Sequence, residues 1–468
     1  MADDAITPNQ QRSALRTETP SVEPTRSAER SHRYHVGVIG GGPGALFCAE
    51  KLAVAGLGVT LFEAMPSVGR KFLLAGRGGL NLTHSEPMEQ LLERYGEARA
   101  VLEPALRAFD STALRAWCEG LEQPTFVGSS GRVFPDAFRA TPLLRNWLRR
   151  LERLEVDLRT RCRWVGWAKQ SHNEKMNTGK PPPILIRNSD GAVVELEFDA
   201  IVCALGGASW PSVGSDGTWT AFFEERGVAV NPLRAANCGV QVAWSEHFQT
   251  EFPGTPLKNI AMAVGPAASA VPEAALRMHL GEAMVTESGL EGSLIYALGA
   301  SIAAELDAPT EAFVFCDLLP HLEVSDVEAR LAGARPGQST TTVLRKRLGL
   351  PPVAVALLRE SIGPAVPRDP HALAVLLKRV AIKIEGFEPL ERAISTAGGV
   401  SLMEIDEHYM LRRIPGVFVV GEMLDWTAPT GGYLLQGAFS TAAAAAQGVE
   451  SWLGATITAE ASESASTL

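Results

Sequence analysis

The stretch from Tyr34 to Glu63 (YHVGVIGGGPGALFCAEKLAVAGLGVTLFE) most constrains the fold of this chain. Its order of patterns predicts a strand at 36–39, a glycine turn, a helix beginning at Pro43 and a second strand at 59–62. Gly40, Gly42 and Ala45 occupy the three small positions of the G-x-G-x-x-G/A fingerprint. The stretch therefore predicts one βαβ unit that binds a dinucleotide.

The spacing of this unit supports the assignment. Gly40 permits a tight turn, Gly42 lets the backbone approach a pyrophosphate, and Ala45 allows the helix to pack closely on the strand. Pro43 suits the first helical position, and the free N–H groups of the helix start face the phosphates. Glu63 follows about twenty residues later, where a carboxylate accepts hydrogen bonds from ribose hydroxyls. The unit by itself does not distinguish FAD from NAD.

Two later strands end in similar ligand-binding patterns. The apolar run 200–204 ends at Ala204 before Gly206, and the run 416–420 is followed by Gly421 and Glu422. Ligands of open α/β sheets bind at such carboxyl ends of strands. A second G-x-G-x-x-G is missing from the sequence, so a separate NAD domain is not indicated.

A glycine-dense, partly basic loop follows the first unit, from Gly69 to Glu86. Arg70 and Lys71 could neutralise a pyrophosphate. Gly78 would let the backbone approach a flat ring system, and Asn81 offers hydrogen bonds to it. A surface loop with incidental charges is the alternative for this segment.

Composition limits the classes of partner. The 468 residues carry a net charge of −10, which disfavours a nucleic-acid surface. The six cysteines form no C-x-x-C pair, so neither a metal site nor a dithiol centre is expected, and a reducing cytoplasm fits. No apolar run is long enough to span a membrane. The expected partner is a small-molecule substrate, and the sequence gives no oligomeric state.

The changes of texture along the chain predict an α/β protein in several segments. Residues 1–33 are expected to form a disordered extension and 454–468 a flexible tail. The dinucleotide-binding domain is predicted from two segments, 34–232 and 391–453. The insert between them, 233–390, is predicted to have a β-barrel-like part (233–316 and 377–390) and a small helical part (317–376).

Seven motifs together resemble the HI0933-like family of FAD-dependent oxidoreductases, over Tyr34 to about Leu453. They are VIGGGPGA (38–45), GRKFLLAGRGGLNLTH (69–84), GRVFP (131–135), ALGGASWPSVGSDG (204–217), GEAMVTESGLEG (281–292), STAGGVSLMEID (395–406) and GEMLDWTAPTGGYLLQ (421–436). The resemblance implies a Rossmann-like FAD-binding domain built from both chain ends, interrupted by the insert. It also implies tight, non-covalent FAD.

The resemblance implies roles for individual residues. Gly40, Gly42 and Ala45 would hold the pyrophosphate, Glu63 the adenosine ribose and Val165 the adenine. Gly421 and Glu422 would lie by the ribityl chain, and the backbone of Gly432, Tyr433 and Leu434 at the pyrimidine edge of the flavin. The full predicted set of cofactor-binding residues is Gly40, Gly42, Pro43, Gly44, Ala45, Glu63, Ala64, Arg70, Lys71, Gly78, Asn81, Val165, Ala204, Gly206, Gly421, Glu422, Gly432, Tyr433 and Leu434.

This chain departs from the common family pattern in several places, including Trp426 and Leu434 in the last motif. Many members have GGGRCN where this chain has Leu80 in place of the cysteine, so a thiol mechanism there is excluded. Glu287 stands where many members have histidine. The candidates for proton transfer are His84, Glu287 and Glu291; a solvated loop residue is the alternative for each.

The leading hypothesis is hydride transfer between FAD and a small organic substrate, with NAD(P)H as a possible transient electron donor. A flavoprotein that modifies RNA is the first alternative, and a non-catalytic flavin or nucleotide sensor is the second. All three require the same cofactor site.

Overall fold

A five-stranded parallel sheet forms the centre of the structure. This computed structural model describes residues 32–466 apart from 77–78, 170–179, 267–275, 336 and 364–365, with side chains to Gly454. The strand order is β20 (Val417–Val419), β10 (Ala200–Cys203), β1 (His35–Ile39), β2 (Gly58–Glu63) and β6 (Asp157–Thr160). Their apolar side chains are buried, as expected when helices cover both faces of a parallel sheet.

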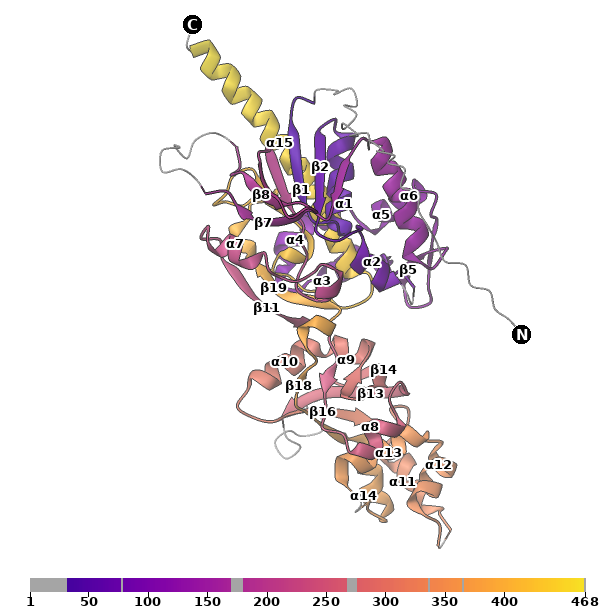
Figure 1. Cartoon of the computed structure of the whole chain (residues 1–468). Helices are drawn as coiled ribbons and strands as arrows, with labels where there is room; N and C mark the ends of the chain where they lie inside the picture. The colour runs from indigo at the N-terminus through magenta and orange to yellow at the C-terminus, as the bar shows by residue number, and fades with distance from the viewer. Residues whose placement is uncertain are drawn as a thin grey trace, which may run out of the picture.

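Both ends of the chain contribute to this sheet and its helices. α1 (Pro43–Val54) packs against α15 (Tyr433–Ser466), and β20 lies beside β10 (Figure 1). The predicted α/β fold, with a Rossmann-like domain made from both chain ends, is confirmed.

The other helices and strands of this part surround the parallel sheet. The helices are α2 (Arg70–Ala75), α3 (Met88–Glu93), α4 (Arg99–Ala108), α5 (Ser111–Glu119), α6 (Ala140–Arg153) and α7 (Thr220–Glu224). Two three-stranded antiparallel sheets flank it, in the orders β3 (Thr83–His84), β5 (Arg132–Pro135), β4 (Thr125–Val127) and β7 (Arg163–Trp167), β8 (Ile184–Arg187), β9 (Val193–Leu196).

The middle of the chain forms a second body, joined to the first by the antiparallel pair β11 (Val230–Ala236) and β19 (Ser395–Val400) (Figure 1). Its seven-stranded sheet has the order β17 (Val380–Ile384), β16 (Ala312–Asp317), β13 (Pro256–Pro266), β14 (His279–Val285), β15 (Gly289–Glu291), β12 (Val240–Gln241), β18 (Gly386–Phe387). Its helices are α8 (Glu246–Glu251), α9 (Ser293–Ala297), α10 (Gly299–Asp307), α11 (Val324–Ala332), α12 (Thr340–Leu348), α13 (Pro352–Ile362) and α14 (Pro370–Lys378).

Two separate hydrophobic cores correspond to these two bodies. One core draws on residues 36–228 and 400–453, and the other on residues 240–384. The predicted domain limits at 232, 390 and 453 remain predictions. The predicted disordered extension, 1–33, lies outside the described residues except for its last two positions.

α15 continues as a helix to Ser466, into the segment predicted as a flexible tail, and the flexibility of that segment stays a prediction. After Gly454 the sequence contains neither glycine nor proline and has several alanines and glutamates, which favour continuation of a helix.

Candidate functional site

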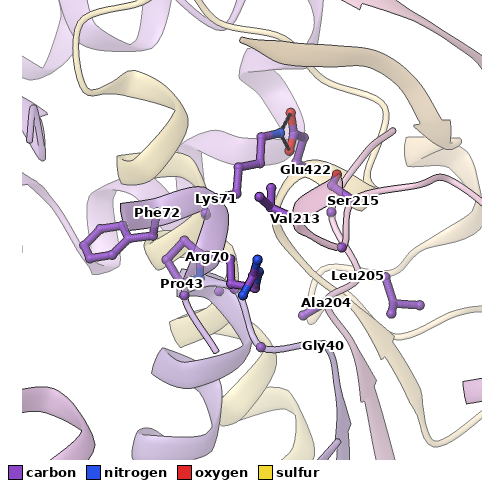
Figure 2. Close-up of a pocket in the computed structure, with 18 of the residues that line it drawn as sticks. Gly40, Pro43, Arg70, Lys71, Phe72, Ala204, Leu205, Val213, Ser215 and Glu422 are labelled. Carbon is purple, nitrogen blue, oxygen red and sulfur yellow. Dashed lines mark hydrogen bonds and ion pairs between the residues drawn. The ribbon is translucent and has the colours of Figure 1, made fainter. Parts of the chain in front are cut away.

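A cavity of about 640 Å³ lies at the carboxyl edge of the parallel sheet (Figure 2). Ile39, the last residue of β1, and Phe62, next to the last residue of β2, line it. Ala204 after β10 and Val420 after β20 also line it. This is the edge at which open α/β sheets bind ligands, and the volume is in the range of cofactor sites.

The first βα turn forms one wall of the cavity. Gly40 has a φ of +116°, and a Cβ atom there would overlap the carbonyl oxygen of Ala204. Gly42 is the N-cap of α1, and the position of its missing Cβ has no atom within 4 Å. The turn therefore needs glycine at 40 for its own geometry, whereas glycine at 42 leaves room for a ligand.

Glu63 lies next to Gly41 of this turn. Its Oε1 accepts a hydrogen bond from the N–H of Met65 (2.7 Å), and a Cβ on Gly41 would overlap its other oxygen. Burial raises the pKa of Glu63, although hydrogen bonds from the N–H groups of Met65 and Gly41 and the charges of Arg163 and Arg70 act in the opposite direction. An acceptor held in this position suits a ribose hydroxyl.

Two neighbouring basic residues of α2 have different surroundings. Nζ of Lys71 lies 2.8 Å from Oε2 of Glu422 and donates to Oγ of Ser209 (2.7 Å). Arg70 instead follows Gly69, whose N–H donates to the carbonyl oxygen of Gly41 in the glycine turn (2.8 Å). The buried Nε of Arg70 has no hydrogen-bond partner within the described structure. Lys71 thus forms an ion pair within the protein, whereas the guanidinium of Arg70 can bind a phosphate.

The start of α15 closes the other end of the cavity. Gly431 and Gly432 have φ values of +136° and +95°, and a Cβ on Gly432 would lie 2.5 Å from Cα of Thr83 in β3. The hydroxyl of Tyr95 donates to the carbonyl oxygen of Tyr433 (2.8 Å). These contacts fix the first turn of the helix, whose free N–H groups are suited to an electron-rich ring edge.

His84 is part of a group of side chains that also fixes this turn. Its ring stacks on Tyr433 with centroids 5.4 Å apart. Nδ1 accepts from the N–H of Glu86 (3.2 Å), so Nε2 carries the proton and donates to the carbonyl oxygen of Ser130 (3.0 Å). Both ring nitrogens are therefore engaged by the protein's own backbone.

Glu86 is the charged centre of the same group. Arg94 donates to both carboxylate oxygens, at 3.2 and 2.8 Å. Burial alone would raise the pKa of Glu86, but the hydrogen bonds from Arg94 and Tyr433 outweigh it and hold this pKa below its usual value. The ionised carboxylate thus connects α3 and its loop to the start of α15.

A Glu86→Gln variant is expected to lower the melting temperature at pH 7 by a few degrees, because a hydrogen-bonded charge is lost from a nearly buried site. A lowered pKa gives stability that is present above the unfolded-state value of about 4.3 and is lost as the pH falls through the folded-state value. The difference between variant and wild type should therefore shrink below about pH 4.

Thermal unfolding followed by circular dichroism at several pH values measures this effect. Glu89→Gln is the matched control, because Glu89 also pairs with arginines but is 63% exposed and should contribute little. A difference between Glu86→Gln and wild type that is the same at every pH would contradict a role for the charge.

The far end of the cavity is aromatic. Trp164, Trp219 and Phe222 line it, and Nη1 of Arg163 pairs with Oδ2 of Asp216 at 2.8 Å. Val165, the predicted adenine contact, is not among the lining residues. Its two preceding neighbours, Arg163 and Trp164, line the cavity instead, and the pairing of β7 with β8 is irregular directly after Trp164.

Four buried polar atoms on the cavity wall have no hydrogen-bond partner within the described structure. They are Nε of Arg70, Oδ1 of Asn81, Nε1 of Trp164 and Oγ of Ser215. Buried polar groups are rarely left unpaired, so such a group around one cavity indicates a polar ligand. Their distribution from the aromatic end to the α15 end fits an extended dinucleotide such as FAD.

Most of the predicted cofactor residues are brought together on this wall. Those lining it are Gly40, Gly42, Pro43, Gly44, Glu63, Ala64, Arg70, Lys71, Asn81, Ala204, Gly206, Gly421, Glu422, Gly432 and Leu434. Ala45 is buried behind the turn, Tyr433 stacks on His84, and Gly78 lies outside the described residues. The individual roles of these residues remain predictions.

None of the proposed proton-transfer residues lines the cavity. His84 is held as described above, while Glu287 and Glu291 lie at β15 and the turn before it, in the second body. Their catalytic role stays a prediction. Arg132, Ser215 and Trp219 line the cavity, but they were not predicted to do so. In the sequence, only the membership of Arg132 in GRVFP and of Ser215 in ALGGASWPSVGSDG pointed to them.

The described part of the chain shows neither a metal site nor a membrane span. It contains no group of three His, Cys, Asp or Glu side chains placed to hold a metal ion. Among the helices that the structure describes, none combines the length and apolarity required to cross a membrane.

A model of the HI0933-like protein Rossmann domain matches residues 34–448. The chain belongs to the HI0933-like family. The members of this family are FAD-dependent oxidoreductases. The predicted family and enzyme class are therefore confirmed.

Individual relatives of this HI0933-like chain have different activities. It is 25% identical over 437 residues to the ribosomal RNA dihydrouridine synthase of Haemophilus influenzae, covering 87% of this chain and 96% of that protein. It is also 25% identical to the 3-dehydro-bile acid delta(4,6)-reductase of Clostridium scindens over 429 residues, 87% of this chain and 96% of the relative. A solved 3-ketosteroid-delta4-(5alpha)-dehydrogenase from Rhodococcus jostii RHA1 is 14% identical, with a TM-score of 0.47 and coverage of 90% and 98%.

Proposed function

We propose that this enzyme transfers a hydride between FAD and a small organic substrate that binds at the α15 end of the cavity, with NAD(P)H as the electron donor. When bound, FAD supplies the two-electron chemistry. The observation that carries the proposal is the single cavity joining the Gly40–Gly44 turn to the start of α15. Its wall at the glycine turn is suited to phosphates and its α15 end is suited to a ring.

The protein's own residues have distinct tasks in this proposal. Arg70 and the N-terminus of α1 bind the pyrophosphate, and Glu63 accepts hydrogen bonds from the adenosine ribose. Lys71 holds the Glu422 carboxylate in place, and Oε1 of Glu422 also accepts from the N–H of Thr396 (2.9 Å). The first turn of α15 orients the ring, and the apolar wall excludes water.

The purified protein is expected to be yellow and to release free flavin when denatured. Mixing it with NADPH or NADH without oxygen should bleach the visible flavin band, and an added substrate of the correct class should restore it. A colourless protein that FAD does not reconstitute would overturn the proposal. A flavin that neither nucleotide reduces would overturn the proposed donor alone.

Reduction of a base in RNA is a second candidate, because one surface feature favours it. Phe126 and Phe138 are 40% and 45% exposed and stack on each other, and Phe126 also stacks on Phe134. Phe138 packs on Gly79 at the cavity wall. Exposed aromatic rings are stacking platforms for unpaired bases, and the Haemophilus influenzae relative is a ribosomal RNA dihydrouridine synthase. Reoxidation of the reduced flavin by ribosomal RNA, but not by uridine, would favour this candidate.

A further inference from the structure

The cavity contains four basic side chains in the described structure, and they differ in what they contact. Lys71 pairs with Glu422 and Arg163 pairs with Asp216. Arg70 follows Gly69, which hydrogen-bonds to Gly41 of the glycine turn where the proposed pyrophosphate binds. Arg132 is the fourth, and its guanidinium has no hydrogen bond or ion pair to the described residues.

Arg132 lies at the α15 end of the cavity. It begins β5, where it is opposite His84 of β3, and the adjacent Thr83 packs against Gly432 at the start of α15. β5, which carries Arg132, thus lies about 5 Å from β3, the strand that contacts the start of α15. In the glycine turn, a Cβ on Gly44 would contact α15 at Ala438, five residues or about 7.5 Å further along the helix.

Arg132 lines the cavity from the half-buried side of β5. Val133 and Pro135 are buried on one side of the strand, whereas Arg132 and Phe134 are half-buried on the other. The same cavity has apolar walls from Leu80, Leu434 and Trp426. Arginine in such surroundings binds a carboxylate through two parallel hydrogen bonds, which are stronger than those between neutral groups.

We infer that Arg132 binds the carboxylate of the substrate and makes this enzyme selective for small organic acids with an apolar body. The inference rests on the proposed function, because FAD must occupy the remainder of the cavity. Arg132 is a specificity-determining residue in this scheme and takes no part in proton or hydride transfer.

Benzoate and its neutral counterpart benzamide test the inference on the FAD-loaded protein. Each is titrated while the change in the visible flavin band is recorded. Benzoate should bind at least about tenfold more tightly than benzamide, and Arg132→Gln should weaken benzoate binding by about tenfold or more with little effect on benzamide. Arg132→Lys should restore part of the benzoate affinity, because it retains the charge without the planar fork.

Arg139→Gln is the matched control, since Arg139 is exposed, lies outside the cavity lining and carries the same charge. It should leave benzoate binding unchanged. Equal benzoate affinity in Arg132→Gln and wild type, or no saturable change with benzoate, would overturn the inference. Loss of FAD from Arg132→Gln would also overturn it and make Arg132 a cofactor residue. Failure of the wild type to hold FAD would instead reject the proposed function.

Discussion

A Gly40→Ala variant is expected to lose FAD and to unfold more easily than the wild-type chain. The φ of +116° is unfavourable for alanine, and its methyl group would overlap the carbonyl oxygen of Ala204, at the junction of β1 and β10. Backbone strain of this kind costs about 1–3 kcal/mol, and the overlap adds to it. FAD content by absorption and the midpoint of urea unfolding measure the two effects.

Two matched variants separate the causes. Gly56→Ala has a similar left-handed φ (+84°) but no atom within 4 Å of the new methyl group, so it should cost stability without removing FAD. Gly42→Ala has an ordinary φ of −78° and a methyl group that points into open space. It should fold normally and bind FAD at least about tenfold more weakly. Full FAD binding by Gly42→Ala would contradict the phosphate position.

The second large effect is expected for Glu63→Ala, which should raise the Kd for FAD by about 10- to 100-fold. A hydrogen bond to a charged group contributes about 1.5–3 kcal/mol, and 1.4 kcal/mol corresponds to a factor of ten. Isothermal titration of the flavin-free protein with FAD measures the change. Unchanged affinity would end the proposed ribose role.

The pH dependence of FAD binding tests the same carboxylate. Ribose hydroxyls donate to the ionised form, and burial raises the pKa of Glu63 in the FAD-free protein. Affinity should therefore be constant above this raised pKa and fall as the pH drops below it, by up to about tenfold per pH unit. Glu63→Gln is the control: it keeps an acceptor for the N–H of Met65 and should bind FAD with a flatter pH profile.

Local sequence patterns determined the dinucleotide-binding unit. The glycine turn, the helix start at Pro43 and the acid at Glu63 all lie within 30 residues and depend on backbone rules that operate at short range. The same is true of the strand ends at Ala204 and Gly421. Most of the predicted cofactor residues consequently line one cavity.

The position of a side chain across a strand was less accessible to sequence reasoning. Arg163 and Trp164 line the cavity and Val165 does not, and β7 has an irregular register with β8 after Trp164 that no local motif specifies. His84 was a candidate acid or base because of its residue type. Only the structure shows that Ser130 and Glu86 occupy both of its nitrogens.

The sequence by itself determined the family, the cofactor class and the edge of the sheet at which the ligand binds, because these depend on short motifs and strand ends. Only the tertiary structure decided which charges remain free in the cavity. Lys71 and Glu422 are 351 residues apart, and Arg132 reaches the start of α15 only through β3. Lys71 pairs with Glu422 and Arg132 pairs with no described residue because of contacts between distant parts of the chain.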